Sequence, residues 1–264
     1  PPHSHYVSRP PFTEAEAVRR AIYLAGQTDT PLYIAHMTCR EAIAELQKAK
    51  GTGQRVSGET CTHYLTTTKE VLDNPDFNEA AKFVCSPALR DQEDCEALWQ
   101  ALAGGLLTAV SSDHCGIDVA ELKQAGRDDF TQIPNGSPGA GDRLHMVWTE
   151  GVCTGKLSRQ KFVDVIATQP AKINGIYPRK GTLAVGSDAD IVIFDPSYEG
   201  VIRLADNPNG VDYNLYEGHR QSGRVETVLL RGQVVVENAK FVGRYGQGQF
   251  IPASMYASGY ENRN

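Results

Sequence analysis

The sequence predicts an α/β fold built on a parallel sheet, and two observations support this prediction. Short apolar runs alternate with helical patterns of roughly ten to fifteen residues, and about three such units fit in the first 115 residues. The stretch 106–115 (LLTAVSSDHC) is an apolar run that ends in a carboxylate and an imidazole. Continuous apolar runs are typical of strands covered on both faces. Active sites in such folds lie where the strands end, so Asp113 is a candidate functional residue.

In the first half of the chain, helix and strand patterns follow one another in order. Thr13 and Glu16 have the spacing of a capping box, and Thr38 and Glu41 repeat it, so each pair predicts the start of a helix. The expected elements are a helix over 13–27, a strand over 31–37, a helix over 38–51, a strand over 55–61, a loop or short strand over 81–86, a helix over 91–102 and the strand at 106–115.

The composition changes after Asp113. Gly, Pro and Asp are concentrated between 116 and 142, which indicates a long functional loop. The elements expected beyond it are helices over 142–151 and 159–168, the second capped by Ser158, and strands of a small separate sheet over 182–195 and 225–237, the latter with a turn at Arg231-Gly232. The tail from Tyr245 has no helical period, so we expect it to be disordered or to lie across a partner.

Composition and charge exclude several classes of protein. The 264 residues are 41% hydrophobic and 22% charged, as in an ordinary soluble globular protein. The net charge is −6 without a long basic block, so we expect neither nucleic-acid binding nor membrane binding. No apolar run approaches the roughly 18 residues of a membrane span. The six scattered cysteines lack C-x-x-C spacing and predict buried free thiols in a reducing cytosol, and hence a cytoplasmic protein.

The chain begins Pro1-Pro2-His3-Ser4-His5, with neither an initiator Met nor the pattern of a signal peptide. This start suggests that the chain is a piece of a longer polypeptide. His3 and His5 form an H-x-H pair, which could be half of a metal site. They lie in a Pro-rich segment with no strand before it, so a solvated or loop role is favoured for both.

Two expected strand ends carry residues of the types that bind metals. His36 follows the apolar run LYIA, and Asp113 follows LLTAVSS. Neutral imidazole and carboxylate are ligands of Zn²⁺, so the pair suits a metal site at the mouth of a barrel. From these residues alone, a structural role stays open for each, because a strand-end Asp can cap a helix and a lone His is often a hydrogen-bonded structural residue.

Several motifs make the functional prediction more specific. Through them, the chain closely resembles the C-terminal part of the dihydropyrimidinase and D-hydantoinase branch of the amidohydrolase superfamily. The resemblance extends from about Arg9 over nearly the whole chain, with the motifs in family order. The matching stretches are LYIAHMTC (32–39), GETCTHYL (58–65), VCSPALR (84–90), SSDHC (111–115), IPNGSPGAGDR (133–143), TQPAKINGIYPRKGTLAVGSDADIVIFDP (168–196) and DYNLYEG (212–218).

The resemblance implies a fold and a set of site residues. The fold is a TIM-like (β/α)₈ barrel with a β-sandwich beside it. Residues 1–178 match the C-terminal part of the barrel, 179–244 match part of the sandwich, and 245–264 form an extended tail. His36 matches the family's metal-ligating His on the sixth barrel strand, and Asp113 matches the zinc-ligating Asp on the eighth. Ser86 and the backbone of Asn135 match the groups that hold the cyclic amide substrate.

The remaining ligands of the family's two zinc ions are absent from this sequence. They are a His-x-His pair on the first strand, a carboxylated Lys that bridges the metals and a His on the fifth strand, and all would lie upstream of Pro1. His3 and His5 do not replace them, because they match the loop after the fifth-strand His. The oxyanion-stabilising Tyr would also lie upstream. We therefore expect the intact parent to be the enzyme and this chain alone to be incomplete and inactive.

For the intact parent, the resemblance implies zinc-dependent hydrolysis of dihydropyrimidines or 5-substituted hydantoins to N-carbamoyl amino acids, as in pyrimidine catabolism. Asp113 would be both ligand and general acid/base, and the assembly would be a homotetramer. A non-catalytic protein like the collapsin response mediator proteins is an alternative, although the retained His36 and Asp113 argue against it. Allantoinase is another. Ring preference, enantioselectivity and the choice among zinc, manganese and cobalt stay open.

Other polar residues near the motifs receive structural interpretations. His114 and Cys115 follow Asp113 directly, but successive residues at a strand end point in different directions, which favours packing for both. His63 is interpreted either as a residue that supports a metal ligand or as a buried hydrogen-bonding residue, with the latter favoured. His145 and His219 have no motif and are taken as structural or surface residues.

Overall fold

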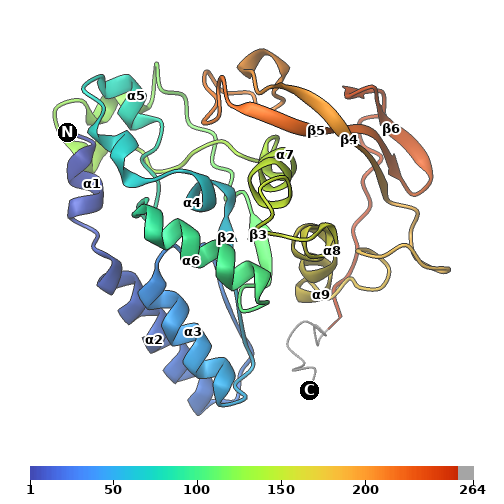
Figure 1. The fold of residues 1–264 in the computed structure, drawn as a ribbon, viewed down its shortest axis with the longest axis horizontal. Coiled ribbons are helices and arrows are strands. Elements are labelled where there is room, and N and C mark those ends of the chain that lie inside the picture. Colours follow the sequence, from blue (N-terminus) through green and yellow to red (C-terminus); the bar gives the residue numbers. More distant parts are fainter. Residues whose placement is uncertain (255–264) are drawn as a thin grey trace.

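The computed structural model describes residues 1–254, which form two sheets with helices packed around the first (Figure 1). Helices α2, α3 and α6 lie on one side of the parallel sheet, and α7, α8 and α9 lie between it and the antiparallel sheet. The helices are α1 (His3–Val7), α2 (Pro11–Gln27), α3 (Arg40–Gly51), α4 (Thr62–Thr66), α5 (Phe77–Ala81), α6 (Gln92–Ala103), α7 (Arg143–Val147), α8 (Arg159–Val163) and α9 (Gln169–Ile173). The strands are β1 (Leu32–Ile34), β2 (Val56–Cys61), β3 (Ala109–Ser111), β4 (Ile191–Val201), β5 (Arg220–Leu230), β6 (Gln233–Glu237) and β7 (Lys240–Phe241).

The first sheet confirms the predicted parallel α/β arrangement. Within residues 1–254, its order is β1-β2-β3, and both pairs of neighbouring strands are parallel. Ile34 pairs with Gly58, and Cys61 pairs with Ser111. Because all three strands run in the same direction, their carboxyl ends lie at one edge of the sheet.

The strands are shorter than the apolar runs predicted. The run 106–115 contributes only Ala109–Ser111, because the N–H groups of Leu106 and Leu107 both donate to the carbonyl of Ala101 at the end of α6. These two leucines therefore complete the turn that ends the helix. The strand expected over 31–37 is likewise limited to Leu32–Ile34.

The two predicted capping boxes are wrong: Thr13 and Glu16 contact Pro10 and Arg20 in their own segment, and Thr38 contacts a distant helix. Helix α2 begins at Pro11, and α3 begins at Arg40 without a side-chain cap. Thr38 of the second predicted box hydrogen-bonds to Glu14 in α2 instead. The predicted cap at Ser158 is confirmed, since its Oγ accepts from the N–H of Lys161 at 3.1 Å.

The core of the first layer lies between the parallel sheet and helices α3 and α6. Met37, Leu46 and Leu107 are almost fully buried here. Gly58 lies in the central strand, and a Cβ atom at this position would lie 2.6 Å from Met37 Sδ and 3.2 Å from a Leu46 methyl. Only glycine allows these side chains to approach the strand so closely. The central strand is thus packed tightly where it leads to the carboxyl edge.

The second sheet is antiparallel, with the order β4-β5-β6-β7. The predicted turn at Arg231-Gly232 is confirmed, and both residues have positive φ (48° and 78°), as in the two-residue hairpin turns that match strand twist. The strand predicted over 182–195 is wrong in its first part, because β4 begins at Ile191. Ion pairs from Lys180 to Asp188 and Asp190 hold the preceding segment as a loop.

The helical region that follows the long loop differs from the prediction in its bounds. A π-helical turn (Trp148–Val152) extends α7 through the expected range. A second π-helical turn (Asp164–Thr168) joins α8 to α9, so helical structure continues to Ile173 instead of ending at 168. The loop over 116–142 contains short 3₁₀ turns at Lys123–Gly126 and Phe130–Gln132. Of the predicted tail, 255–264 lie outside the described residues.

The cysteines were predicted to be free and buried, and the structure agrees with the first point and partly with the second. All six are free, and four are buried. Burial raises the pKa of the Cys85 and Cys95 thiols to about 11 each. Cys115 and Cys153 are exposed, contrary to the prediction, because they lie in loops after a strand and a helix.

Among residues 1–254, no helix has both the length and the apolar character needed to cross a bilayer.

His3 and His5 both lie in helix α1 and not in a loop. The solvated role predicted for them is confirmed for His3, which is exposed, and is wrong for His5. The His5 side chain is buried, and its Nε2 donates to the carbonyl of Cys85 at 2.7 Å. Burial lowers the pKa of His5 from 6.5 to about 4, which outweighs the opposing effect of this hydrogen bond. His3 contacts Asp73 on the surface. His5 is thus a neutral structural residue that anchors the segment leading to Ser86.

This burial makes stability depend on pH. As the pH falls from 6.5 to 4, the unfolded chain binds a proton at His5 before the folded chain does, so the free energy of unfolding decreases. The expected slope is at most about 1.4 kcal/mol per pH unit. Urea unfolding of the protein and of the His5→Gln variant is measured between pH 4 and pH 7. The contribution of His5 is the difference between the two proteins in the slope of the free energy of unfolding against pH. Equal slopes would show that His5 is not its source.

Candidate active site at the strand ends

Three residues of the types that bind metals or protons occupy equivalent positions at the carboxyl edge of the parallel sheet. His36 is the second residue after β1, His63 the second after β2 and Asp113 the second after β3. Because β2 lies between β1 and β3, His63 lies between the other two along this edge. The pKa of His63 is lowered to about 3, chiefly by burial and further by the charge of His36. The sequence predictions for His36 and Asp113 therefore converge on one edge.

The backbone at His36 and Asp113 is in a conformation that is uncommon for these residues. Their φ angles are 41° and 44°, in the left-handed region that favours glycine. Such strained residues are concentrated at functional sites, where the surrounding structure holds them in place. His36 is half-buried and Asp113 is exposed. Within residues 1–254, neither side chain makes a hydrogen bond or an ion pair, so both are available to a ligand.

These donors fit a divalent metal in kind but not in number. A neutral imidazole and a carboxylate match the ligand chemistry of zinc, which takes three or four protein ligands. The described part of the chain holds no group of three His, Cys, Asp or Glu side chains that could bind a metal. His36 and Asp113 can therefore supply part of a metal site, and a complete site needs ligands beyond this pair.

The structure also brings together the two residues predicted to hold substrate. The Oγ of Ser86 donates to Oδ1 of Asn135 at 2.8 Å, and both residues are exposed. The N–H of Gly136 donates to the carbonyl of Val84 at 3.0 Å, which joins the two segments next to this pair. Ser86 and Asn135 therefore form a polar pair on the surface of two joined loops.

The Asn135 loop also contacts the segment that carries Asp113. The N–H of Cys115 donates to the carbonyl of Ser137 at 3.0 Å, and His114 forms a parallel bridge with Ser137. Gly136 has a φ of 143°, and a Cβ atom there would lie 2.7 Å from the Cβ of Cys115. Only glycine allows this close contact. The polar pair is thus fixed beside the end of β3.

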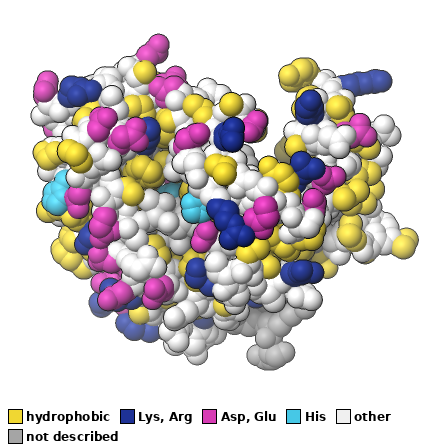
Figure 2. All heavy atoms as spheres, turned by 45° about the horizontal axis from the view of Figure 1, so that its top comes forward, with side chains coloured by type: hydrophobic (Ala, Val, Ile, Leu, Met, Phe, Trp, Pro, Cys, Tyr) yellow, Lys and Arg dark blue, Asp and Glu magenta, His cyan; other side chains and the backbone are white. Residues whose placement is uncertain are grey.

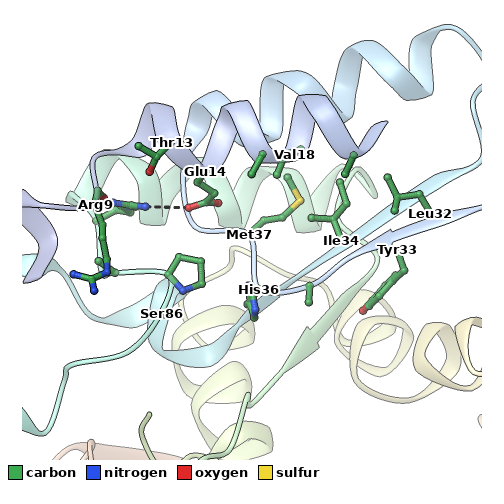
Figure 3. A pocket seen from close by; sticks show the side chains of 16 residues that line it. Arg9, Thr13, Glu14, Val18, Leu32, Tyr33, Ile34, His36, Met37 and Ser86 are labelled. Carbon is green, nitrogen blue, oxygen red and sulfur yellow. Dashed lines mark hydrogen bonds and ion pairs between the residues drawn. The ribbon is translucent and has the colours of Figure 1, made fainter. Parts of the chain in front are cut away.

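A pocket of about 580 Å³ connects His36 with Ser86 (Figure 3). It runs along β1 and its extension to Met37, beneath α2, and ends at the segment 86–90. Figure 3 shows Glu14 and Val18 of α2 facing the segment that carries His36. The predicted metal donor on β1 and a predicted substrate donor therefore line one cavity.

The remaining motif residues have mainly structural contacts. His114 is exposed, contrary to the packing predicted for it, and its Nδ1 accepts from the N–H groups of Gly139 and Ala140 at 3.3 and 3.4 Å. His63 was expected to form a buried hydrogen bond, but its buried Nε2 has no partner within residues 1–254. His145 accepts from the N–H of Val225, and His219 contacts Glu150 at 2.9 Å.

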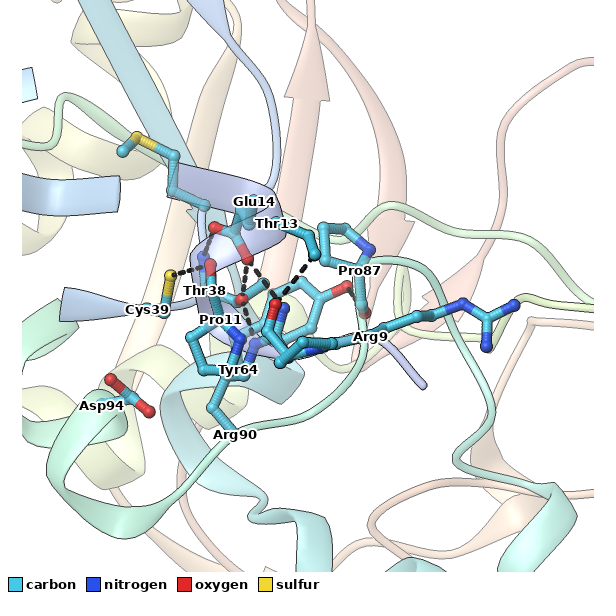
Figure 4. Close-up of polar contacts among 12 residues, drawn as sticks. Arg9, Pro11, Thr13, Glu14, Thr38, Cys39, Tyr64, Pro87, Arg90 and Asp94 are labelled. Carbon is cyan, nitrogen blue, oxygen red and sulfur yellow. Dashed lines mark hydrogen bonds and ion pairs between the residues drawn. The ribbon is translucent and has the colours of Figure 1, made fainter. Parts of the chain in front are cut away.

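Sequence reasoning missed a buried network that supports the His36 segment (Figure 4). Glu14 Oε1 accepts from the N–H of Thr38 at 2.7 Å, and its Oε2 pairs with Arg90 Nη2 at 3.1 Å. Arg90 Nε also donates to the Thr38 hydroxyl at 2.9 Å. Thr38 is two residues beyond His36, so the network ties this segment to α2 and to the segment after Ser86. No local pattern marks these residues, because their partners lie far apart in sequence.

The fold and the strand-end site are those of an α/β protein that carries possible metal ligands at the carboxyl edge of a parallel sheet. A sequence profile described as "Amidohydrolase family" matches residues 24–235, and the chain belongs to this family.

Individual relatives agree with this assignment. The chain is 49% identical to a D-hydantoinase of Ralstonia pickettii over 252 residues, which cover 96% of this chain and 55% of the relative. It is 40% identical to a dihydropyrimidinase of Rattus norvegicus over 257 residues, covering 97% and 49%. The resemblance inferred from the motifs is confirmed. The chain spans about half the length of the curated relatives it matches.

Solved structures show the same fold. The crystal structure of dihydropyrimidinase from Brevibacillus agri superposes with a TM-score of 0.95 at 45% identity, covering 97% of this chain and 55% of that one. L-hydantoinase from Arthrobacter aurescens superposes with a TM-score of 0.84 at 32% identity, covering 91% and 52%. The chain therefore has the α/β fold of this family, with its parallel sheet.

Proposed function

We propose that the protein to which this chain belongs is a metal-dependent cyclic amidohydrolase that opens dihydropyrimidines or 5-substituted hydantoins to N-carbamoyl amino acids. The observation that carries the proposal is the pair of unpartnered donors, His36 and Asp113, held in strained backbone after β1 and β3 at the same edge of the sheet, beside Ser86 and Asn135. The names of the similar proteins, D-hydantoinase and dihydropyrimidinase, support the substrate class. The same donors disfavour a non-catalytic role.

In this proposal, His36 and Asp113 would hold part of a two-zinc site, and a carboxylated Lys and the other ligands would come from outside this chain. Bound zinc would supply a hydroxide nucleophile near neutral pH and polarise the amide carbonyl. Asp113 would ligate through one carboxylate oxygen. Its other oxygen would hold the proton from the attacking water and deliver it to the leaving ring nitrogen.

Ser86 and Asn135 position the substrate in this mechanism. The Ser86 hydroxyl and the backbone of Asn135 offer hydrogen-bonding groups to the planar cyclic amide. Since their segments are joined to each other and to the end of β3, they would fix the amide plane relative to the nucleophile. The Oγ of Ser86, which now contacts Asn135 Oδ1, would exchange this contact for one with the substrate.

The domain organisation belongs to the same proposal. Residues 1–178 would form the C-terminal part of a (β/α)₈ barrel, and 179–244 part of a β-sandwich. The antiparallel sheet supports the second assignment, because one of its faces carries the row of paired residues Val192, Val228, Val236 and Phe241, of which Val192 and Phe241 are exposed. Figure 2 shows hydrophobic side chains over this side of the molecule. An apolar sheet face is typical of a sheet that packs against another. A cytoplasmic homotetramer is the assembly we propose.

Removal of the metal tests the proposed function. The full-length protein is treated with a chelator and assayed with dihydrouracil, a 5-substituted hydantoin and allantoin, then reloaded with zinc, manganese or cobalt. We expect hydrolysis of the first two substrates to fall at least about 100-fold without metal and to return on reloading. Preferred hydrolysis of allantoin would contradict the substrate class, and a metal-loaded protein inactive on all three would contradict the enzyme assignment.

A further inference from the structure

Lys123 is a buried lysine that lies beneath the Ser86–Asn135 pair. Its side chain is fully buried, and its Nζ donates to the carbonyls of Ala81 and Gly136 at 2.8 Å and to that of Val84 at 3.3 Å. Within the described residues, no carboxylate forms an ion pair with it. An ammonium group has three donors, so these three carbonyls satisfy it completely. The contacts are made to backbone alone, at Ala81 at the end of α5, at Val84 in the segment after this helix and at Gly136 in the Asn135 loop.

Keeping this charge inside the protein is costly. Burial lowers the pKa of Lys123 to about 8. A buried ammonium is tolerated only where its hydrogen bonds are satisfied. These hydrogen bonds go to backbone carbonyls and to no charged side chain. Their effect is therefore to fix the distances between the backbone segments around the Lys123 ammonium group.

The three carbonyls belong to the two segments that carry the proposed substrate-binding residues. Val84 is two residues before Ser86, and Gly136 directly follows Asn135. Further contacts join the same segments: the N–H of Gly136 donates to the Val84 carbonyl at 3.0 Å, and Ser137 Oγ donates to the Lys82 carbonyl at 3.0 Å. Lys123 belongs to neither segment and binds both at once, at the carbonyls of Val84 and Gly136.

We propose that Lys123 is a positioning residue that sets the distance between Ser86 and the backbone of Asn135, and thereby the orientation of the cyclic amide. This inference rests on the proposed function for its substrate and for the roles of Ser86 and Asn135. Lys123 does not reach the substrate, since its ammonium group is enclosed by the three carbonyls. Ser86 and the Asn135 backbone would hold the ring both before and during the reaction, so a change in their spacing would weaken binding of substrate and transition state alike and raise KM more than it lowers kcat.

The test uses Lys123→Met in the full-length, metal-loaded protein, because methionine keeps most of the apolar stem and removes the ammonium group. We expect KM for dihydrouracil or a hydantoin to rise about 10-fold or more and kcat to change less, with unchanged metal content. The matched control is Lys50→Met. Lys50 is also partly buried and donates to a backbone carbonyl, that of Leu106 at 2.9 Å, but at the opposite end of β3. KM should be unchanged in this control.

A double-mutant cycle separates the role of Lys123 from the assignment of Ser86. If Lys123 acts through the substrate-binding pair, the effect of Lys123→Met on KM should shrink in the Ser86→Ala background. Full additivity, or a KM within twofold of wild type for Lys123→Met, would overturn the inference. An unchanged KM for Ser86→Ala alone would overturn the substrate role of Ser86 in the proposed function, and with it the route by which Lys123 acts.

Ser137→Ala provides a second measurement if Lys123→Met does not fold. It removes the hydrogen bond from Ser137 Oγ to the Lys82 carbonyl, a weaker tie between the same segments, together with the side-chain hydrogen bond between Ser137 and Tyr213. We expect a smaller rise in KM, of about two- to fivefold, with kcat and metal content unchanged. A reduced kcat at unchanged KM would contradict a positioning role for this tie between the loops.

Discussion

Replacing Asp113 with asparagine is expected to reduce kcat/KM for a hydantoin by roughly 1,000-fold or more in the full-length, metal-loaded protein. Asparagine has nearly the same shape, but its amide cannot carry the proton from water to the ring nitrogen and is a weaker metal ligand. The strained backbone at Asp113, with φ at 44°, is tolerated by asparagine, which keeps the fold in place. Steady-state kinetics and metal analysis of the same sample measure both effects.

Asp118→Asn is the matched control for this prediction. Asp118 lies in the same loop and is half-buried, but its Oδ1 accepts from the N–H of Asp212 at 3.1 Å and so has a structural partner. We expect its kcat/KM to stay within a few-fold of wild type. If Asp113→Asn kept its metal and lost less than 10-fold in kcat/KM, Asp113 would not be the proton carrier.

The strand-end part of the site could be predicted from the sequence, for a physical reason. An apolar run followed by polar residues places those residues at the end of a buried strand, and parallel strands bring such ends to one edge. His36 and Asp113 were found in this way. The resemblance added Ser86 and Asn135, which no periodicity marks. Their contact at 2.8 Å depends on loops whose joining is visible only in the structure.

The supporting residues could not be predicted, because the same sequence pattern serves local and distant partners. Thr38 has the spacing of a helix cap, yet its hydroxyl donates to Glu14, in another helix. Lys123 lies in a loop rich in glycine and charge, where a lysine is normally solvated, and it is fully buried. The strand predicted over 182–195 failed similarly, since ion pairs to Lys180 hold its first half as a loop.

The buried ion pair of Arg90 and Glu14 leads to the largest expected loss of stability. Their side chains are 5% and 10% exposed. Arg90→Met is expected to lower the free energy of unfolding by about 3 to 5 kcal/mol, because it leaves the Glu14 carboxylate buried without its cation. Urea unfolding of the full-length protein measures this loss. Because Thr38 follows His36 by two residues and loses a donor, metal affinity should fall as well.

Arg20→Met on the same helix is the control. Arg20 pairs with Glu16 at 3.4 Å, and both side chains are more than 60% exposed. Since exposed pairs contribute little, the expected loss is below about 0.5 kcal/mol.

The double variant Glu14→Leu with Arg90→Met distinguishes the cost of an unpaired charge from the value of the pair. Removing both charges should restore part of the stability lost in Arg90→Met, because no charge is then left buried alone. Metal affinity should stay low, since Thr38 has still lost both side-chain partners and the His36 segment is no longer held. A double variant that regains both stability and metal affinity would show that the network does not position His36. One less stable than either single variant would show that the pair itself is the main source of stability here.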